Sequence, residues 1–141
     1  MKITNLVAGK KVVTISPNAN MQDLVNFLDT HHVGALVVSS DGRSIEGIVS
    51  ERDVVRAMPG KLDQLITMHV RDIMTVDVIT CNSDATVADL MNIMTERRIR
   101  HIPVVDEAGN AISIVSIGDV VKAHISELDS EAKALREYVS S

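Results

Sequence analysis

The chain contains two serines that are each followed three residues later by an aspartate, directly after an apolar run. The segments "GIVSERD" and "SIVSIGD" place Ser50 with Asp53 and Ser116 with Asp119. Two kinds of chemistry fit this spacing. The pair can cap the first turn of a helix, with aspartate in place of the usual glutamate or glutamine. Alternatively, the hydroxyl and the free N–H groups of the helix can hold a phosphate while the carboxylate accepts from two adjacent hydroxyls. The two roles are compatible, because a hydroxyl can exchange partners.

Both motifs belong to a longer internal repeat. Residues 12–58 align with residues 78–124 at a constant shift of 66 positions and without gaps, and 14 of the 47 aligned positions are identical. The two serines and the two aspartates are among these identities. A gapless match of this length indicates a duplication.

Each copy predicts the same order of elements, β-α-β-β-α. A short β-rich run ("VVTIS" or "VITC") comes first, and a helix with apolar residues on one face follows it. A strand ("ALVVSS" or "HIPVVD"), a glycine-containing turn and a second apolar strand then lead into Ser-x-x-Asp and a last helix. The strands are apolar throughout, so we expect them to be covered on both faces. The fold class is therefore α/β (α+β), built from two repeats.

These elements divide the chain into four parts. Residues 1–60 hold the first repeat with an N-terminal lead-in, 61–77 form a linker with short helical turns, and 78–126 hold the second repeat. Residues 127–141 extend its last helix. In that helix a two-heptad apolar seam is too short for a free coiled coil, so we expect it to pack on its own domain or on a partner's equivalent helix. The seam consists of Ile125, Leu128, Ala132, Leu135 and Val139.

The composition argues against several classes of protein. The net charge of −5 and the presence of only two aromatic residues disfavour nucleic-acid binding, which depends on neutralising phosphates and stacking bases. No apolar run is long enough to cross a bilayer, and the N-terminus lacks a signal-peptide pattern. Cys81 is the only cysteine, so no intrachain disulfide can form, and a cytoplasmic location is expected. Neither a metal-ligand cluster nor a P-loop sequence is present.

The repeat, the paired Ser-x-x-Asp motifs, the segment "RIRHIPVVDEAGN" and the "DIMT" that precedes the second repeat together resemble a known family. Over about residues 1–126 the chain resembles a tandem of cystathionine-β-synthase (CBS) domains, also called a Bateman module. The resemblance implies two repeats related by a pseudo-twofold axis, with two clefts between them that bind adenine nucleotides or related adenosyl ligands. It also implies a disc-like homodimer. Such modules are usually fused to an enzyme, channel or transporter, and this one is expected to stand alone.

The resemblance also assigns roles to residues. It implies that Asp53 and Asp119 hold a ribose while Ser50 and Ser116 face the phosphate. It further implies that each cleft combines the Ser-x-x-Asp of one repeat with a strand edge of the other. The first cleft would then join Asp53 to Arg100, His101 and Ile102, and the second would join Asp119 to Ala35 and Leu36. Because the second set has no base, the first cleft should suit a phosphate better. The second motif also departs from the family pattern, with Ser113 where the first has Gly47.

There are three candidate functions. The first is a regulatory module whose adenine-nucleotide ligand (AMP, ADP, ATP or an NAD-like molecule) biases the packing of the two repeats, with no obligatory cofactor and an unknown regulated partner. The second is an interaction module that dimerises without a ligand. The third is an enzyme acting on a nucleotide, but no nucleophile with a suitable base supports it.

Overall fold

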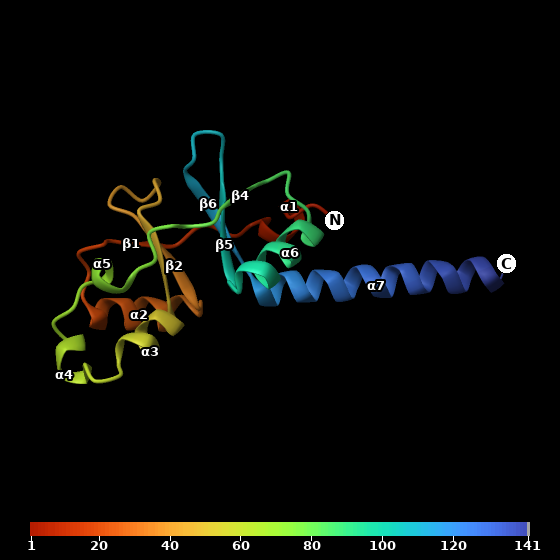
Figure 1. Ribbon diagram of the computed structural model, residues 1–141. Coiled ribbons are helices and arrows are strands. Elements are labelled where there is room, and N and C mark those ends of the chain that lie inside the picture. The colour runs from red at the N-terminus through yellow and green to blue at the C-terminus, as the bar shows by residue number, and fades with distance from the viewer. Residues whose placement is uncertain (141) are drawn as a thin grey trace.

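The computed structural model describes residues 1–140, and both copies follow the predicted β-α-β-β-α order (Figure 1). The first repeat consists of β1 (Thr14–Ile15), α2 (Met21–His31), β2 (Ala35–Val38), β3 (Gly47–Ser50) and α3 (Glu51–Ala57). The second consists of β4 (Cys81–Asn82), α6 (Val87–Arg97), β5 (His101–Val105), β6 (Ala111–Ser116) and α7 (Ile117–Ser140). Short helices lie before and between them, namely α1 (Thr4–Val7), α4 (Leu62–Leu65) and α5 (Val70–Ile73).

Each repeat contains one three-stranded sheet, in the order β1-β2-β3 or β4-β5-β6. In both sheets the first two strands are parallel and the last two are antiparallel. The register is the same in each copy, because Ala35 pairs with Ser50 and His101 pairs with Ser116. The start of the middle strand therefore lies beside the serine of the Ser-x-x-Asp motif.

Local sequence determines where the long helices begin and end. The Asn20 side chain accepts from the backbone N–H of Asp23 at the start of α2, and Thr86 forms a capping box with Asp89 at the start of α6. Each helix ends at a residue in the left-handed conformation, His32 with φ 52° and Arg98 with φ 54°. These C-caps turn the chain into β2 and β5.

Each repeat has its own aliphatic core, and each core is completed by a lead-in segment from elsewhere in the chain. Ile3 is fully buried in the second repeat, and Val70 is fully buried in the first. The two segments bind in the same way, because the Ile3 N–H donates to the carbonyl of Ala85 at 3.0 Å and the Val70 N–H donates to that of Ala19 at 2.9 Å. The shift between Ile3 and Val70 is 67 positions. The lead-in at the N-terminus thus packs on the second repeat.

Helix α7 continues well past the second repeat and projects from the body of the molecule (Figure 1). Val120 and Ala123 are buried on its inner face, whereas every residue from Leu128 to Ser140 is exposed. Of the two arrangements expected for the C-terminal seam, packing on its own domain is therefore not found. No helix among residues 1–140 is both long and apolar enough to cross a membrane.

The lead-in contact makes a prediction about stability. Replacing Ile3 by alanine should lower the free energy of unfolding by about 2–5 kcal/mol, because a large side chain is removed from a packed core. The control is Ile66→Ala in the linker, where the side chain is 80% exposed and the loss should stay within about 0.5 kcal/mol. Urea unfolding measures both variants, and equal losses would contradict the assignment of Ile3 to the core.

Candidate functional site

Both Ser-x-x-Asp motifs cap helices in the structure. The backbone N–H and the hydroxyl of Ser50 donate to Asp53 Oδ2 at 2.8 and 3.0 Å, and the Asp53 N–H donates to Ser50 Oγ at 3.3 Å. At the start of α7, the Ser116 N–H donates to Asp119 Oδ2 at 3.0 Å, and the Asp119 N–H donates to Ser116 Oγ at 3.2 Å. The capping chemistry inferred from the spacing is thus present in both copies.

The strands and helices are tied together at these caps. The N–H of Glu51, at the start of α3, donates to the carbonyl of Gly34 at 3.0 Å, and the N–H of Ile117 donates to that of Arg100 at 2.8 Å. Each Ser-x-x-Asp therefore lies beside the first residue of the neighbouring strand. In each repeat, the capped helix and the strand start form one rigid corner.

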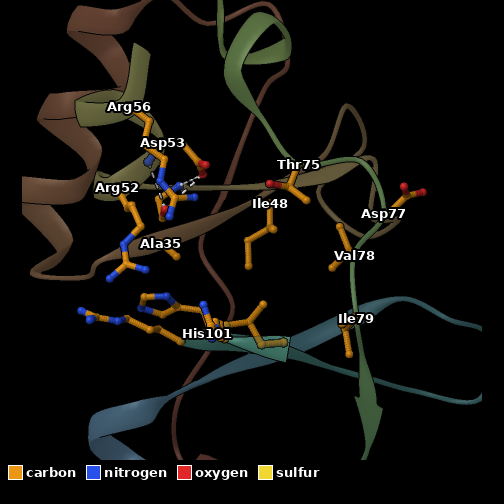
Figure 2. Close-up of a pocket in the computed structure, with 14 residues that line it drawn as sticks. Ala35, Ile48, Arg52, Asp53, Arg56, Thr75, Asp77, Val78, Ile79 and His101 are labelled. Atoms are coloured by element: carbon orange, nitrogen blue, oxygen red, sulfur yellow. Dashed lines mark hydrogen bonds between the residues drawn. The ribbon is translucent and has the colours of Figure 1, made fainter. Parts of the chain in front are cut away.

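A first cleft lies where the corner of the first repeat meets β5 of the second (Figure 2). It brings Ser50 and Asp53 together with Arg100 and His101, the combination that the sequence analysis expected. In Figure 2, Arg52 extends from α3 toward His101 across the cleft. The opposite wall comes from the segment just before β4. The remaining lining residues are Ala35, Ile48, Arg56, Thr75, Asp77, Val78, Ile79, Arg98 and Ile99.

The wall before β4 explains why position 47 is a glycine. A Cβ atom on Gly47 would lie 2.8 Å from both Met74 Sδ and the carbonyl oxygen of Thr75. Thr75 is also paired with Ile48 through two backbone hydrogen bonds of 2.9 Å. The glycine therefore allows the linker to approach β3 closely and close the first cleft on that side.

A second cleft contains Ser116, Asp119 and Ala35, again as expected from the sequence. Its other lining residues are Lys10, Lys11, Val12, Val13, His31, His32, Val33, Gly34, His101, Ser113 and Ile114. Most of these positions match the first cleft at the 66-residue shift of the repeat, for example Val12 with Val78 and Gly34 with Arg100. The two clefts are thus related by the duplication itself.

The equivalent positions carry side chains of different size and charge. At the 66-residue shift, Arg52, Arg100 and His101 of the first cleft correspond to Gly118, Gly34 and Ala35, each in the other repeat. The large side chains fill space, so the first cleft has a volume of about 160 Å³ and the second about 440 Å³. The first cleft is therefore narrow and rich in arginine, and a ligand would enter it by displacing flexible side chains rather than backbone.

Two of the expected site residues do not line either cleft. Leu36 and Ile102 are fully buried in the cores of the first and second repeats. In a β-strand, neighbouring side chains point to opposite faces, so Ala35 and His101 can face the clefts while the next residue faces the core. Any contact of Leu36 or Ile102 with a ligand would therefore be through the backbone.

His101 lies between the two clefts and lines both. Its ring is packed tightly, because a Cβ atom on Gly34 would approach the His101 Nε2 atom to 3.2 Å. Burial lowers the pKa of His101, and Arg100 lowers it further, while Glu51, Asp119 and Asp53 oppose this shift. The net downward shift favours the neutral imidazole in the ligand-free protein.

The two aspartates differ in how much of each carboxylate is engaged. Lys10 Nζ lies 3.0 Å from Asp119 Oδ1, whereas the hydrogen bonds to Asp53 within residues 1–140 all reach its Oδ2 atom. Burial alone would raise the pKa of Asp119, but hydrogen bonds from Ser116 and Lys10 bring the net pKa below its usual value. Asp53 Oδ1 is thus free to accept from a ligand, while Asp119 already has a cationic partner.

Other reactive groups are few in the described part of the chain. Burial raises the pKa of Cys81 to about 11, so its thiol stays protonated and packs against the second core. Among residues 1–140, no three or more histidine, cysteine, aspartate or glutamate side chains gather in a group that could hold a metal ion.

The sequence did not predict that the segment before the first strand of each repeat forms a wall of a cleft. Thr75, Val78 and Ile79 close the first cleft, and Lys10 and Lys11 close the second. The repeat alignment contained a signal for them, because it begins at Val12 and Val78, just where these walls lie. Arg52 and Arg56 were also missed, although a helix that starts with the capping motif must carry them near Asp53.

The comparisons with known proteins agree with this architecture. The family model for the CBS domain matches residues 6–60 and again residues 70–126. A mitochondrial CBS domain-containing protein of Arabidopsis thaliana is 40% identical over 121 residues, which cover 83% of this chain and 58% of that protein. The chain thus spans little more than half of that relative.

Solved structures show the same fold. A CBS-domain containing protein from Agrobacterium tumefaciens is 38% identical, with a TM-score of 0.81, and the match covers 88% of this chain and 99% of that one. A CBS domain protein from Pyrobaculum aerophilum, solved in complex with AMP, is 26% identical with a TM-score of 0.75 over 84% of this chain and 89% of that one. From the duplicated β-α-β-β-α unit, the paired clefts and these matches, the chain belongs to the CBS domain family and contains a tandem pair of its domains.

Proposed function

We propose that this protein is a regulatory module that binds an adenine nucleotide or a related adenosyl ligand in the first cleft. The observation that carries the proposal is the meeting of a carboxylate with a free oxygen, Asp53, and a group of basic side chains in one cleft. An acceptor for ribose hydroxyls and donors for phosphate are the two features that such a ligand needs. The AMP complex of the Pyrobaculum aerophilum relative supports the ligand class.

The expected pose follows from the chemistry of each wall. The ribose hydroxyls donate to Asp53 Oδ1, and the phosphate lies toward Arg100, Arg52 and His101. The adenine packs between aliphatic side chains, which Ile48, Val78 and Ile79 supply. Because no phenylalanine, tyrosine or tryptophan side chain lines this cleft, we expect the site to hold the base by burial and by backbone hydrogen bonds.

The signal arises because both repeats contribute to the cleft. A ligand that touches both can favour one relative packing of the repeats over another, by an amount equal to its difference in affinity for the two. In this proposal the protein needs no obligatory cofactor and catalyses no reaction. The regulated partner is a further protein, and a cytoplasmic location remains our expectation.

We further propose that the protein forms a homodimer. The same homodimer is central to the alternative function, in which the protein is an interaction module that needs no ligand. The helices carry exposed apolar side chains at equivalent positions of the two repeats, such as Val55 on α3 and Val121 on α7. An apolar groove between α2 and α3, lined by Val25 and Val54 among others, continues this surface. Exposed apolar area that is spread over both repeats favours contact with a second copy.

Replacing Asp53 by alanine should weaken the binding of adenosine, AMP and ATP by a similar factor of about one hundred, because hydroxyl bonds to a carboxylate are lost. The variant also loses a helix cap, which costs about 0.5–2 kcal/mol of stability. Asp89→Ala is the matched control, since Asp89 caps α6 in the same way and lies outside both clefts. Titration calorimetry at fixed salt decides, and unchanged affinity in Asp53→Ala would remove the ribose role.

Replacing Arg100 by alanine should weaken the binding of the phosphate groups rather than that of the ribose. The preference for ATP over adenosine should fall by about tenfold, while adenosine itself binds as before, because only the phosphate contacts are lost. Arg97→Ala serves as the control, because Arg97 is exposed at the end of α6 and does not line the cleft. Dissociation constants at one ionic strength test this, since exposed charge pairs are screened. An equal loss for adenosine and ATP would show that Arg100 does not bind phosphate.

The protonation of His101 should report where the phosphate of a bound ligand lies. Its pKa lies below the ordinary value of 6.5 in the ligand-free protein, so its contribution to stability is complete above about pH 6.5 and declines as the pH falls below that. AMP should raise this pKa because a phosphate stabilises the imidazolium, and adenosine should not. NMR titration of the imidazole C–H signal, assigned with His101→Gln, measures both. A pKa that responds alike to AMP and adenosine would place the phosphate away from His101.

A further inference from the structure

Helix α7 carries two separate apolar faces. The first, with Val120 and Ala123, is buried in the second repeat. The second has no partner within the described chain. Its exposed fractions are 53% for Ile125, 50% for Leu128, 64% for Leu135 and 75% for Val139. The projecting half of the helix thus presents apolar side chains to solvent.

The spacing of this second face is that of a coiled-coil seam. Ile125, Leu128, Ala132, Leu135 and Val139 follow one another at intervals of 3, 4, 3 and 4 residues. Val121, which is also exposed on the body of the molecule, extends the seam by one more position. At 3.6 residues per turn these side chains all fall within an arc of about 80°. A narrow stripe of this kind fits one partner helix.

The residue types indicate how many helices pair and in which direction. The a positions hold the β-branched Ile125 and Val139, with Ala132 between them, and the d positions hold Leu128 and Leu135. β-Branched residues at a with leucine at d favour a parallel pair of helices. The seam therefore has the pattern of a two-stranded coil.

The charges beside the seam also favour the parallel arrangement. In a parallel pair each g residue meets the e residue five positions later on the other helix. This places Glu131 against Arg136 and His124 against Asp129 of the second copy, twice each by symmetry. Within residues 1–140, neither Glu131 nor Arg136 forms an ion pair in its own chain. Both are thus available to a partner.

The antiparallel arrangement creates repulsion instead. In the antiparallel register that overlaps the helices from Val121 to Val139, equivalent flanking residues face one another. Glu131 then meets Glu131 of the second copy, and Asp129 meets Asp129. Like charges at such positions are unfavourable, so the flanks disfavour this register.

We propose that α7 pairs with α7 of a second copy as a parallel, in-register two-stranded coil from Val121 to Val139. This deepens the homodimer of the proposed function, since it fixes the orientation of the two modules, with both bodies at the same end of the coil. An isolated helix pair this short is marginal. Here the second repeat already holds the first two turns of α7 in helical form, so the cost of nucleation is met before the coil forms.

Cross-linking reads the orientation directly. In a Cys81→Ser background, Val139→Cys places the two thiols at facing a positions, close to the Cα separation that a disulfide requires. Antiparallel helices would hold them about 27 Å apart, the length of 18 residues. The control is Ser130→Cys, which lies on the opposite side of α7. After mild oxidation, non-reducing gels should show a cross-linked dimer for Val139→Cys in at least about fivefold excess over Ser130→Cys. Equal amounts would overturn the proposal.

Charge exchange tests the same arrangement through affinity. Glu131→Arg and Arg136→Glu each replace attractive pairs by repulsive ones, so each variant alone should dimerise about tenfold more weakly. Their mixture should recover the parental affinity, because both new pairs are attractive between unlike chains. Glu137→Arg, the same substitution away from the seam, should have no effect. Sedimentation equilibrium measures all four samples, and a mixture no tighter than the single variants would contradict the parallel pairing.

Nucleotide binding separates this proposal from the function on which it builds. The clefts lie in the body, so AMP calorimetry on Glu131→Arg should match the parent. If the parent dimerises but the Val139→Cys variant does not cross-link, the homodimer stands and the coil is overturned. If the Val139→Cys variant cross-links but the parent does not bind AMP, the ligand proposal is overturned and the coil is supported. A parent that is monomeric in sedimentation overturns both the homodimer and the coil.

Discussion

The rest of this structure depends on one contact, in which the start of one strand pairs with the end of the next. In the first repeat this contact joins Ala35 to Ser50, and in the second it joins His101 to Ser116. It places the beginning of a capped helix next to the first residue of the neighbouring strand, and a backbone hydrogen bond from helix to strand holds that corner together. Once the corner is fixed, the capping carboxylate has one oxygen directed at its own backbone. The pseudo-twofold relation between the repeats then brings each corner against the strand edge of the other repeat. The clefts are thus a consequence of strand register and duplication, and they need no loop of special conformation.

The duplication also makes the two clefts unequal. Positions 35 and 101 are equivalent in the repeat, yet both line both clefts, so they share the space near the axis. The ring of His101 already lies against the backbone at Gly34, which leaves no room for a second large side chain there. The pair Ala35 and His101 is one solution to this constraint, and it places a titratable side chain at a position that faces both sites. The remaining differences follow the same pattern, with arginines on one side and with glycines and a lysine-bound aspartate on the other.

Much of this organisation could be predicted from sequence, because its signals are local or repeated. The element order followed from periodicity and spacing. The family resemblance led us to expect Ser50 and Asp53 in one cleft with Arg100 and His101, and the structure places these four residues together. The rest depends on contacts between distant segments. Nothing local to Ile3 indicates that it belongs to the second core, since its equivalence with Val70 is shifted by one residue relative to the main repeat. The burial of Leu36 and Ile102 likewise required the strand faces to be known. The exposure of the seam on α7 could not be read from periodicity, which is the same for a helix packed inside a domain and for one packed outside it.

The exchange of lead-in segments has a consequence for the order in which the chain acquires structure during synthesis. A nascent chain emerges from its N-terminus, and domains generally fold as they appear. Here the first repeat cannot complete its core until Val70 has emerged, and Ile3 has no binding site until the segment from Ala85 to Ile102 exists. The first core can therefore close once Val70 has emerged, whereas Ile3 stays an unplaced apolar residue until the second repeat is available. Such long-range closure slows folding, and it leaves Ile3 as the lead-in residue that waits longer for its core, because the first repeat needs only Val70.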